Sequence, residues 1–475
     1  MKDFKVINDR PSIVIVNTPA IDVNRLEGEF YKYDYLNAID KIKKIRFLPL
    51  ENLVDDIKDG PGGWDINISD YVEQGVPMLR TINIVDGLVN LDECVFIDIE
   101  KHKQLKRSRV VKNDVLLSVR GTIGKSAVYS KNFEANINAA LVKITLKDNI
   151  IDPYFLVAFF NCKYGRLQTE RIANGAVQLN MNLTEAKSNL IPIPSPEIQK
   201  YIGDKVRKAE ELREEAKRLK KEAEGIIYKE LNFGSLEDKL KIINNKYTWV
   251  GLHNLGIRID SKYYNEKVLR IKDYFNKHYE TIKLKECLQY CSRGKSFAES
   301  SEDGIILIKT KNLNNSFINY ERNFVYEKEV NNNLILKEKD LIFASMGVGS
   351  LGKIDMYYPS EEKATIDGTL MLLRFKSDSK LKPEYVMEFL RTHIGQKLIY
   401  QNVVGSTGII SISVDDLINI DIPYIDDEKQ EKISNFTNKY LTDIYASKRL
   451  IQEAKQDVED LIEGNFDMSK VKANS

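Results

Sequence analysis

Two stretches of the chain, at 196–232 and 426–464, place small or apolar residues at alternating spacings of three and four between charged residues. This spacing puts side chains on one face of an α-helix, and its repetition over several heptads is typical of a coiled coil. The positions are Ala209, Leu212, Ala216, Leu219, Ala223 and Ile226 in the first stretch and Tyr440, Ile444, Ile451, Ala454, Val458 and Leu461 in the second. Because small alanines opposite tyrosine and isoleucine allow close packing, we predict two long helices paired antiparallel. Two independent surface helices are the alternative.

A region of short β-branched runs precedes each long helix, at about 45–190 and 280–423. Gly, Asn and Asp interrupt these runs, as they do at turns between strands. One helix is expected inside each region, from Pro153 to about Arg171 and from Pro383 to about Asn402, because proline is favourable at the first helical position. The pattern predicts β-rich domains that alternate with the long helices.

The order of elements recurs because the sequence is written twice. Residues 25–31 return as residues 258–264, and later segments return at offsets between 226 and 233 residues. A period this long indicates two whole domains rather than a solenoid. We predict an α+β fold with approximate two-fold symmetry. Its parts are β-rich domains at 1–195 and 233–425, long helices at 196–232 and 426–464, and a flexible tail at 465–475.

Composition narrows the class of protein. Of the 475 residues, 43% are hydrophobic, so both domains can bury an ordinary core. No apolar run approaches the roughly 18 residues of a membrane span, and the first residues do not form a signal peptide. Four cysteines in a chain of this length do not make a disulfide framework. We expect a cytoplasmic protein without a membrane segment.

The charges are balanced overall but not locally. The net charge is +1, yet residues 101–125 hold eight Lys and Arg against Asp114 alone. The matching stretch of the second half, 327–353, holds four basic and four acidic residues. A run of this kind indicates either a solvated basic surface or a surface that faces phosphate. The difference between the halves suggests that their partners are not identical.

Signals of catalysis are weak. Residues 121–126 resemble the end of a phosphate-binding P-loop, but Val119 stands where that motif needs glycine, and a strand-like run follows Lys125. The four histidines are scattered, and Cys287 and Cys291 have no second pair of metal ligands. No glycine-rich loop for adenosylmethionine precedes a helix. We expect no catalytic residue, metal or cofactor in this chain.

Polar segments at equivalent places in both halves are better candidates for binding. Residues 79–83 and 308–312 each present a cation, a hydroxyl and an amide, groups that pair with phosphates and with guanine or adenine edges. Glycine-rich loops that end in Lys125 and Lys353 let backbone N–H groups approach phosphate. Ordinary exposed strand ends are the alternative. The predicted DNA-binding residues are Arg80, Thr81, Asn83, Lys106, Arg107, Arg109, Arg120, Thr122, Lys125, Gln178 and Asn180 in the first half and Lys295, Lys309, Thr310, Lys311, Asn312, Lys353, Ser406 and Thr407 in the second.

In their order, and in the repetition of that order, these segments resemble the specificity subunit of a type I restriction-modification system. The resemblance covers residues 25–461. It is carried by 79–87 with 308–316, by 114–125 with 340–353, by 153–165 with 383–395, and by 191–199 with 422–430. It implies a non-enzymatic reader of double-stranded DNA. Each β-rich domain would be a target-recognition domain that binds one half of a bipartite site, and the helices would set the spacing.

The resemblance also implies partners. Two adenine methyltransferase subunits would carry adenosylmethionine and flip the target base, and helicase-nuclease restriction subunits would join them for cleavage in phage defence. Residues 25–31 also resemble specificity subunits of type IIB-like systems, whose partner chain both methylates and cleaves. A scaffold that joins two protein ligands without DNA, and an independent enzyme, are the remaining alternatives.

Overall fold

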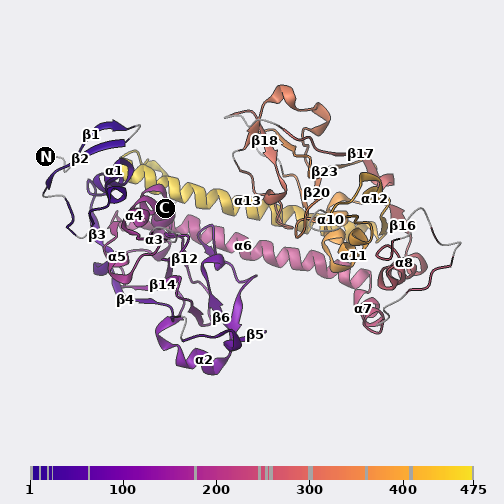
Figure 1. Cartoon of the computed structure of the whole chain (residues 1–475), viewed down its shortest axis with the longest axis horizontal. Coiled ribbons are helices and arrows are strands. Elements are labelled where there is room, and N and C mark those ends of the chain that lie inside the picture. Colours follow the sequence, from indigo (N-terminus) through magenta and orange to yellow (C-terminus); the bar gives the residue numbers. More distant parts are fainter. Residues whose placement is uncertain are drawn as a thin grey trace. The chain divides into compact units, whose positions relative to one another are not determined.

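The computed structural model of the chain describes residues 4–9, 12–18, 21–23, 25–62, 65–175, 179–243, 248–251, 255, 260–297, 303–321, 323–358, 362–405 and 410–472. The chain forms two compact units (Figure 1). Unit 1 combines residues 1–213 with 445–475, and unit 2 comprises residues 214–444. Each unit is therefore completed by parts of both long helices.

Unit 1 contains two main sheets, with strand orders β10-β13-β6-β9-β5 and β12-β11-β14-β4. Strands β13 and β6 are parallel, whereas the other neighbours in these sheets are antiparallel. The strands are β1 (Phe4–Asp9), β2 (Ser12–Val16), β3 (Phe47–Pro49), β4 (Val54–Asp59), β5 (Tyr71–Val72), β6 (Val76–Leu79), β7 (Ile84–Val85), β8 (Leu88–Val89), β9 (Val95–Ile97), β10 (Arg109–Val110), β11 (Val115–Ser118), β12 (Ser126–Val128), β13 (Ala135–Ile137), β14 (Leu141–Leu146) and β15 (Leu190–Pro192). The helices are α1 (Tyr33–Ile42), α2 (Ile99–Gln104), α3 (Pro153–Asn161), α4 (Lys163–Ile172), α5 (Leu183–Lys187), α14 (Ser469–Lys472) and parts of α6 (Pro196–Glu230) and α13 (Asp427–Glu463).

Unit 2 contains sheets of order β17-β23-β20-β21 and β19-β18-β22, and β18 and β22 are again parallel. The strands are β16 (Thr281–Lys283), β17 (Leu288–Arg293), β18 (Ile305–Ile308), β19 (Phe324–Val325), β20 (Leu341–Ala344), β21 (Ile354–Met356), β22 (Ala364–Ile366), β23 (Leu370–Phe375) and β24 (Asp421–Pro423). The helices are α7 (Phe233–Lys241), α8 (Glu266–His278), α9 (Leu284–Cys287), α10 (Pro383–Arg391), α11 (His393–Gln401), α12 (Val414–Ile418) and the remaining parts of α6 and α13.

The two units share one topology. Strands β17, β23, β20 and β21 follow the order of β4, β14, β11 and β12, and the parallel pair β18–β22 matches β6–β13. A glycine recurs where two backbones meet: a Cβ on Gly60 would lie 2.1 Å from Asn138 O, and a Cβ on Gly294 would lie 2.2 Å from Asp367 O. Only glycine permits this approach. The predicted fold class of tandem β-rich domains with long helices is confirmed, whereas the two-fold relation between the units stays a prediction.

The embedded helix of each unit differs from the expectation of one continuous helix. It is broken into α3 and α4 at Cys162, whose backbone is extended, and into α10 and α11 at Thr392. The cause is a sharp turn that a glycine allows. A Cβ on Gly165 would lie 2.1 Å from Phe159 O, and one on Gly395 would lie 2.3 Å from Phe389 O. Helix α4 therefore packs back against the end of α3 and cannot continue it.

The long helices run antiparallel in both units, as predicted (Figure 1). In unit 1 the Ser447 hydroxyl donates to Ala209 O at 2.8 Å, and Lys205 pairs with Asp457 at 2.6 Å. In unit 2 Lys429 pairs with Glu230 at 3.1 Å. The predicted contact positions that are buried are Ala209, Ala216, Leu219, Ala223, Tyr440, Ile444, Ile451, Ala454 and Val458.

The contact face drifts by one residue near the end of each long helix. Ile226 and Leu461 are only half-buried, whereas the next residues, Ile227 and Ile462, are buried. Leu212, in the middle of α6, is also half-buried. An α-helix has 3.6 residues per turn, so a strict seven-residue pattern gradually leaves the contact face. The predicted register is therefore wrong at Ile226 and Leu461.

Part of the predicted flexible tail packs onto unit 1. The ring of Phe466 meets that of Tyr201 edge-on at 6.2 Å, and Lys470, on the short helix α14, pairs with Asp457 at 3.0 Å. These contacts hold the segment after α13 against the helix pair. Among the described residues, no helix is long and apolar enough to span a lipid bilayer.

Candidate nucleic-acid interface

Four segments of unit 1 meet side by side where strands of its two sheets end. The Asn138 N–H donates to Leu79 O, the Val119 N–H to Ala140 O and the Met181 N–H to Val119 O, each at 2.9 Å. We call residues 79–81, 119–122, 138–140 and 179–181 strip 1. This strip brings together five of the predicted binding residues, which are Arg80, Thr81, Arg120, Thr122 and Asn180.

Unit 2 builds the same strip from the equivalent segments. The Asp367 N–H donates to Ile308 O at 3.0 Å, the Ser345 N–H to Thr369 O at 3.0 Å and the Ile412 N–H to Ser345 O at 3.1 Å. We call residues 308–310, 345–347, 367–369 and 410–412 strip 2, which includes the predicted residues Lys309 and Thr310. Gln178, Ser406 and Thr407 lie outside the described residues.

The polar side chains of strip 1 differ in how far they are exposed and in whether they already have hydrogen-bond partners. Arg120, Thr122 and Asn180 are exposed. Arg80 is half-buried, and its guanidinium donates to Glu93 O at 3.0 Å. The Thr81 hydroxyl oxygen is buried without a hydrogen-bond partner. This end of the sheets can therefore offer a guanidinium, hydroxyl groups and an amide to a polar ligand.

Strip 2 contains one of the predicted cationic residues, Lys309, whereas strip 1 contains two, Arg80 and Arg120. The Thr310 and Thr369 hydroxyls share a hydrogen bond of 2.6 Å, and Lys311, just beyond the strip, pairs with Glu321 at 2.5 Å. Met346 bridges to Ser411 in the place where Arg120 bridges to Asn180. Two further predicted residues lie outside the strip: Lys353 is half-buried, and the exposed Lys295 donates to Glu329 O at 3.1 Å. The two strips therefore offer a ligand different chemistry.

Sequence reasoning missed two segments of these strips. Residues 138–140 and 367–369 connect the ends of the two sheets, and the Thr369 hydroxyl bonds directly to Thr310. Their signal was present, because both segments recur in the repeat. The recurrence of these two segments indicates duplication of the chain but does not by itself indicate a binding role.

The predicted base-reading role of Asn83 and Asn312 is wrong. Both side chains are buried, with exposures of 1% and 2%. The Asn83 amide accepts from the Arg80 N–H at 2.9 Å and donates to Asn90 O at 3.0 Å. Asn312 makes the same two bonds, both at 2.8 Å, with Lys309 N–H and Asn319 O. These asparagines hold a turn closed and leave no amide group for a base.

Replacing Asn83 with alanine is expected to lower the free energy of unfolding by about 1–3 kcal/mol, because it leaves a buried N–H and a C=O unpaired. Chemical denaturation of the purified chain measures this loss. Lys106→Ala is the control, and this exposed site should change stability by less than about 0.5 kcal/mol. Unchanged stability together with an altered DNA sequence preference would restore the base-reading interpretation.

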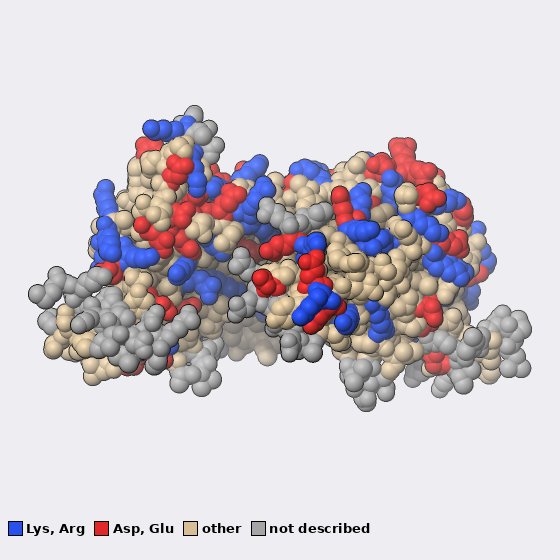
Figure 2. All heavy atoms as spheres, turned by 90° about the horizontal axis from the view of Figure 1, so that it is seen from above, with Lys and Arg blue, Asp and Glu red and all other residues tan. Residues whose placement is uncertain are grey.

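The basic run at 101–125 is partly compensated in three dimensions. Its acidic partners lie outside the run, some next to its ends and some in distant segments. The ion pairs are Lys101–Asp70, Lys103–Glu100, Arg107–Asp59 and Arg109–Glu134. Among the described residues no ion pair holds Lys106, Arg120 or Lys125. On the face shown in Figure 2, basic and acidic side chains are interspersed and do not form one uniform patch.

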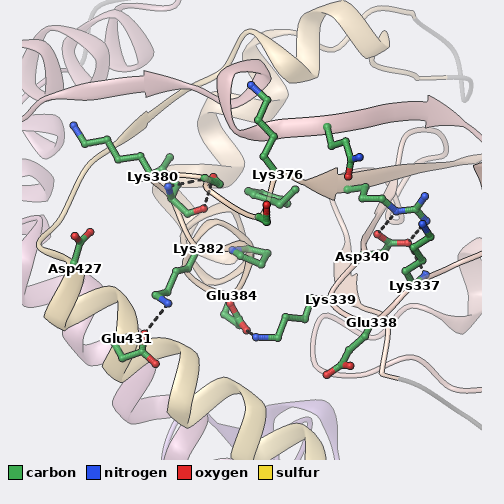
Figure 3. A pocket seen from close by; sticks show the side chains of 17 residues that line it. Lys337, Glu338, Lys339, Asp340, Lys376, Lys380, Lys382, Glu384, Asp427 and Glu431 are labelled. Carbon is green, nitrogen blue, oxygen red and sulfur yellow. Dashed lines mark hydrogen bonds and ion pairs between the residues drawn. The ribbon is translucent and has the colours of Figure 1, made fainter.

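A cavity of about 720 Å³ in unit 2 shows the same compensation (Figure 3). It lies where β23 leads into α10 and α13 begins, and its lining includes six basic and five acidic side chains. Lys382 pairs with Glu431 at 2.6 Å, and Lys339 with Glu384 at 2.9 Å. Although burial alone would raise it, the pKa of the Glu384 carboxyl is lowered overall by its bond to Lys339. This cavity therefore satisfies its own charges.

Three of the four cysteines are poorly suited to chemistry as thiolates. Burial raises the pKa of the Cys94 thiol to about 11 and those of Cys162 and Cys291 to about 12. Such thiols stay protonated near neutral pH, and a thiolate is the form that attacks or binds metal.

Known proteins match the segment that contains strip 1. The family model "Type I restriction modification DNA specificity domain" matches residues 70–224. This segment is similar to a type I DNA specificity domain. The matched segment, called the specificity domain from here on, runs from β5 through strip 1 into the long helix α6, and the match confirms the family resemblance inferred from sequence.

Relatives of the specificity domain match over part of their length. The specificity subunit of the Escherichia coli type I restriction enzyme EcoBI is 31% identical over 143 residues, which are 30% of this chain and 30% of that protein. The putative type I restriction enzyme MjaX specificity subunit of Methanocaldococcus jannaschii is 28% identical over 134 residues, which are 27% of this chain and 32% of that protein. These matches thus span about a third of either relative.

Two solved structures are also similar. The S subunit of the type I restriction-modification system from M. genitalium is 15% identical, with a TM-score of 0.44, over 89% of this chain and 96% of that one. The HsdS subunit from Thermoanaerobacter tengcongensis is 14% identical, with a TM-score of 0.29, over 89% of this chain and 97% of that one.

Proposed function

We propose that this chain is the DNA-recognition subunit of a type I restriction-modification complex. Strip 1 and strip 2 each read one half of a bipartite DNA site, and the helix pair α6–α13 sets the distance between the halves. Two adenine methyltransferase subunits dock on this chain and supply adenosylmethionine and the catalytic groups. Restriction subunits with helicase and nuclease activity join for cleavage.

One observation supports this proposal above all. The specificity domain contains strip 1, in which polar residues lie at the ends of strands, and unit 2 forms strip 2 with equivalent backbone hydrogen bonds. A repeated binding edge in one chain suits a ligand with two similar halves. The arginine, lysine, threonine and asparagine side chains of the strips are groups that bond phosphates and base edges. The difference between Arg120 and Met346 supports two unlike half-sites.

Adenine methylation mapped across a genome tests the proposal. Cells would express the neighbouring methyltransferase gene with or without this chain. We expect methylation at one split motif only when the chain is present, because the methyltransferase alone does not select a site. Unchanged methylation, with a pull-down showing that the expressed methyltransferase does not bind this chain, would favour the non-DNA scaffold.

The type IIB-like alternative predicts the same methylation but a different partner. If the co-purifying methyltransferase chain also carries a nuclease domain and cleaves DNA without a separate restriction subunit, the type I assignment fails. Mass spectrometry of the purified complex, with a cleavage assay, distinguishes the two.

A further inference from the structure

A cavity of about 580 Å³ in unit 1 begins directly beside strip 1. The loops at 82–87 and 122–125, which continue from strip 1, form one side, and α13 forms the opposite side. Thr122 belongs both to strip 1 and to the cavity lining. Any ligand that covers strip 1 therefore passes the mouth of this cavity.

The cavity is lined by an excess of positive charge. Lys125, Arg166, Lys448 and Lys455 surround it, and Asp86 is the one carboxylate among the described lining residues. Arg166 also pairs with Glu170, outside the lining, at 3.6 Å, so the excess of positive charge rests on the three lysines. Asp86 already accepts a hydrogen bond from Arg213 at 3.2 Å, so its charge is shared. Burial, with a smaller effect from Arg213, lowers the pKa of the Lys448 ammonium, although Asp86 opposes the shift. An anion in the cavity would stabilise these cations.

Two glycines hold the loops of the cavity in place. Gly87 has φ +79°, and a Cβ there would approach the Asn161 amide at 3.3 Å. Gly124 has φ +83°, and a Cβ there would lie 2.5 Å from the Thr169 hydroxyl. Because residues with side chains rarely adopt these angles, both positions require glycine for the loops to take this shape.

Unit 2 fills the equivalent place with paired side chains. Arg391 stands where unit 1 has Asn161, and it pairs with Asp355 at 2.5 Å. Lys220 stands where unit 1 has Ile451, and it donates to Asn315 O at 2.7 Å. Gln396 replaces Arg166 and donates to Gly352 O at 3.0 Å. This cluster is compensated from within, so among the described residues unit 2 has no cationic cavity at the equivalent place.

We infer that the unit 1 cavity holds a backbone phosphate of the DNA that strip 1 reads, and that unit 2 makes no equivalent contact. The inference rests on the proposed function. Its chemistry is that of Lys and Arg groups which neutralise a phosphodiester and release its counterions. The cavity would add affinity and fix position without reading sequence.

The salt dependence of DNA binding tests the inference in the full chain. The test variant is Lys448→Gln with Lys455→Gln, and the charge-matched control is Lys217→Gln with Lys221→Gln on α6 of unit 2. We expect the slope of log K against log salt to become shallower by about 1 in the test variant, with equally weaker binding to all sequences. The control should keep the wild-type slope. Equal slopes in wild type and test variant would overturn the inference.

A second measurement separates this inference from the proposed function. Inorganic phosphate and pyrophosphate are titrated into the chain without DNA, and the melting temperature is recorded. Stabilisation of wild type but not of the test variant, with an unchanged DNA slope, would mean that the cavity takes a small free phosphate compound and would overturn the DNA assignment. If the wild-type chain binds no DNA, the proposed function and the inference are both refuted. If DNA binding is intact but the test variant keeps the wild-type slope of log K against log salt, only the inference is refuted.

Discussion

Replacing Arg391 with methionine is expected to destabilise unit 2 by about 3–5 kcal/mol, because it leaves buried carboxylates without their partner. The Arg391 guanidinium is 4% exposed and pairs with Asp355 at 2.5 Å and with Glu388 at 2.8 Å, and both carboxylates are fully buried. It also donates to the Tyr440 hydroxyl at 2.7 Å. The cluster thus ties α10 and β21 to the helix α13.

The loss of stability caused by Arg391→Met should depend on pH. Burial raises the pKa of Asp355 to about 6, even though Arg391 lowers it. Without Arg391 this pKa rises further. A carboxyl whose pKa is higher in the folded than in the unfolded state favours folding at low pH, and this contribution is lost as pH rises from about 4 through the folded value. We therefore expect Arg391→Met to cost less stability at pH 5 than at pH 7.5.

Denaturant unfolding at both pH values measures these differences. Arg218→Met is the control, because Arg218 is exposed and pairs only along its own helix with Glu215 and Glu222. Pairs of this kind contribute little, so we expect a much smaller change than that caused by Arg391→Met. Adding Asp355→Asn to Arg391→Met should recover part of the loss. Similar effects of Arg391→Met and Arg218→Met would contradict the role of the cluster.

Lengthening the helix pair is expected to change which DNA is methylated. Seven residues would be inserted after Arg213 in α6 and after Ile444 in α13, where the chain passes from one unit to the other. Seven residues add about 10 Å to a helix, the length of about three base pairs. If the helices set the distance between half-sites, the methylated motif keeps both halves and its spacer grows.

Genome-wide methylation mapping measures the new spacer without assuming its length. This matters because each added base pair also rotates one half-site about the DNA axis relative to the other. Insertion of one heptad in α6 alone is the control. This insertion prevents the unit 1 pair Lys205–Asp457 and the unit 2 pair Lys429–Glu230 from forming in one common register, and it should reduce methylation at every spacer. Methylation of the original spacer alone by the doubly lengthened chain would refute the spacing role.

Local patterns predicted the elements whose cause is local. The heptads located the long helices because most contact positions fall on one face, and the register failed at Ile226 only where the drift of the helix had accumulated. The apolar run after Pro153 contains no sign of its break at Cys162. That break depends on how closely Gly165 approaches Phe159 O, a distance that exists only in the folded chain.

The site was predicted less well, because its properties arise between distant residues. Arg80 and Arg120 meet in one strip through the backbone bonds of residues 138–140, which the motifs did not suggest. Asn83 resembles a binding residue in the sequence, but its side-chain amide is occupied by the Asn90 carbonyl across a turn that only the folded chain closes. Likewise, the charge of Arg107 is reduced by Asp59, which lies 48 residues away.

The interleaving of the two units has a consequence for biosynthesis. The core of unit 1 includes Ile451, Ala454, Val458 and Ile462 of α13, residues that follow the whole of unit 2 in the chain. The core of the first domain to leave the ribosome is therefore completed only after the last helix, α13, has been synthesised. Until then its apolar α6 face is open to chaperones and proteases, and a ribosome that stops within α13 would release a chain whose first domain has an incomplete core.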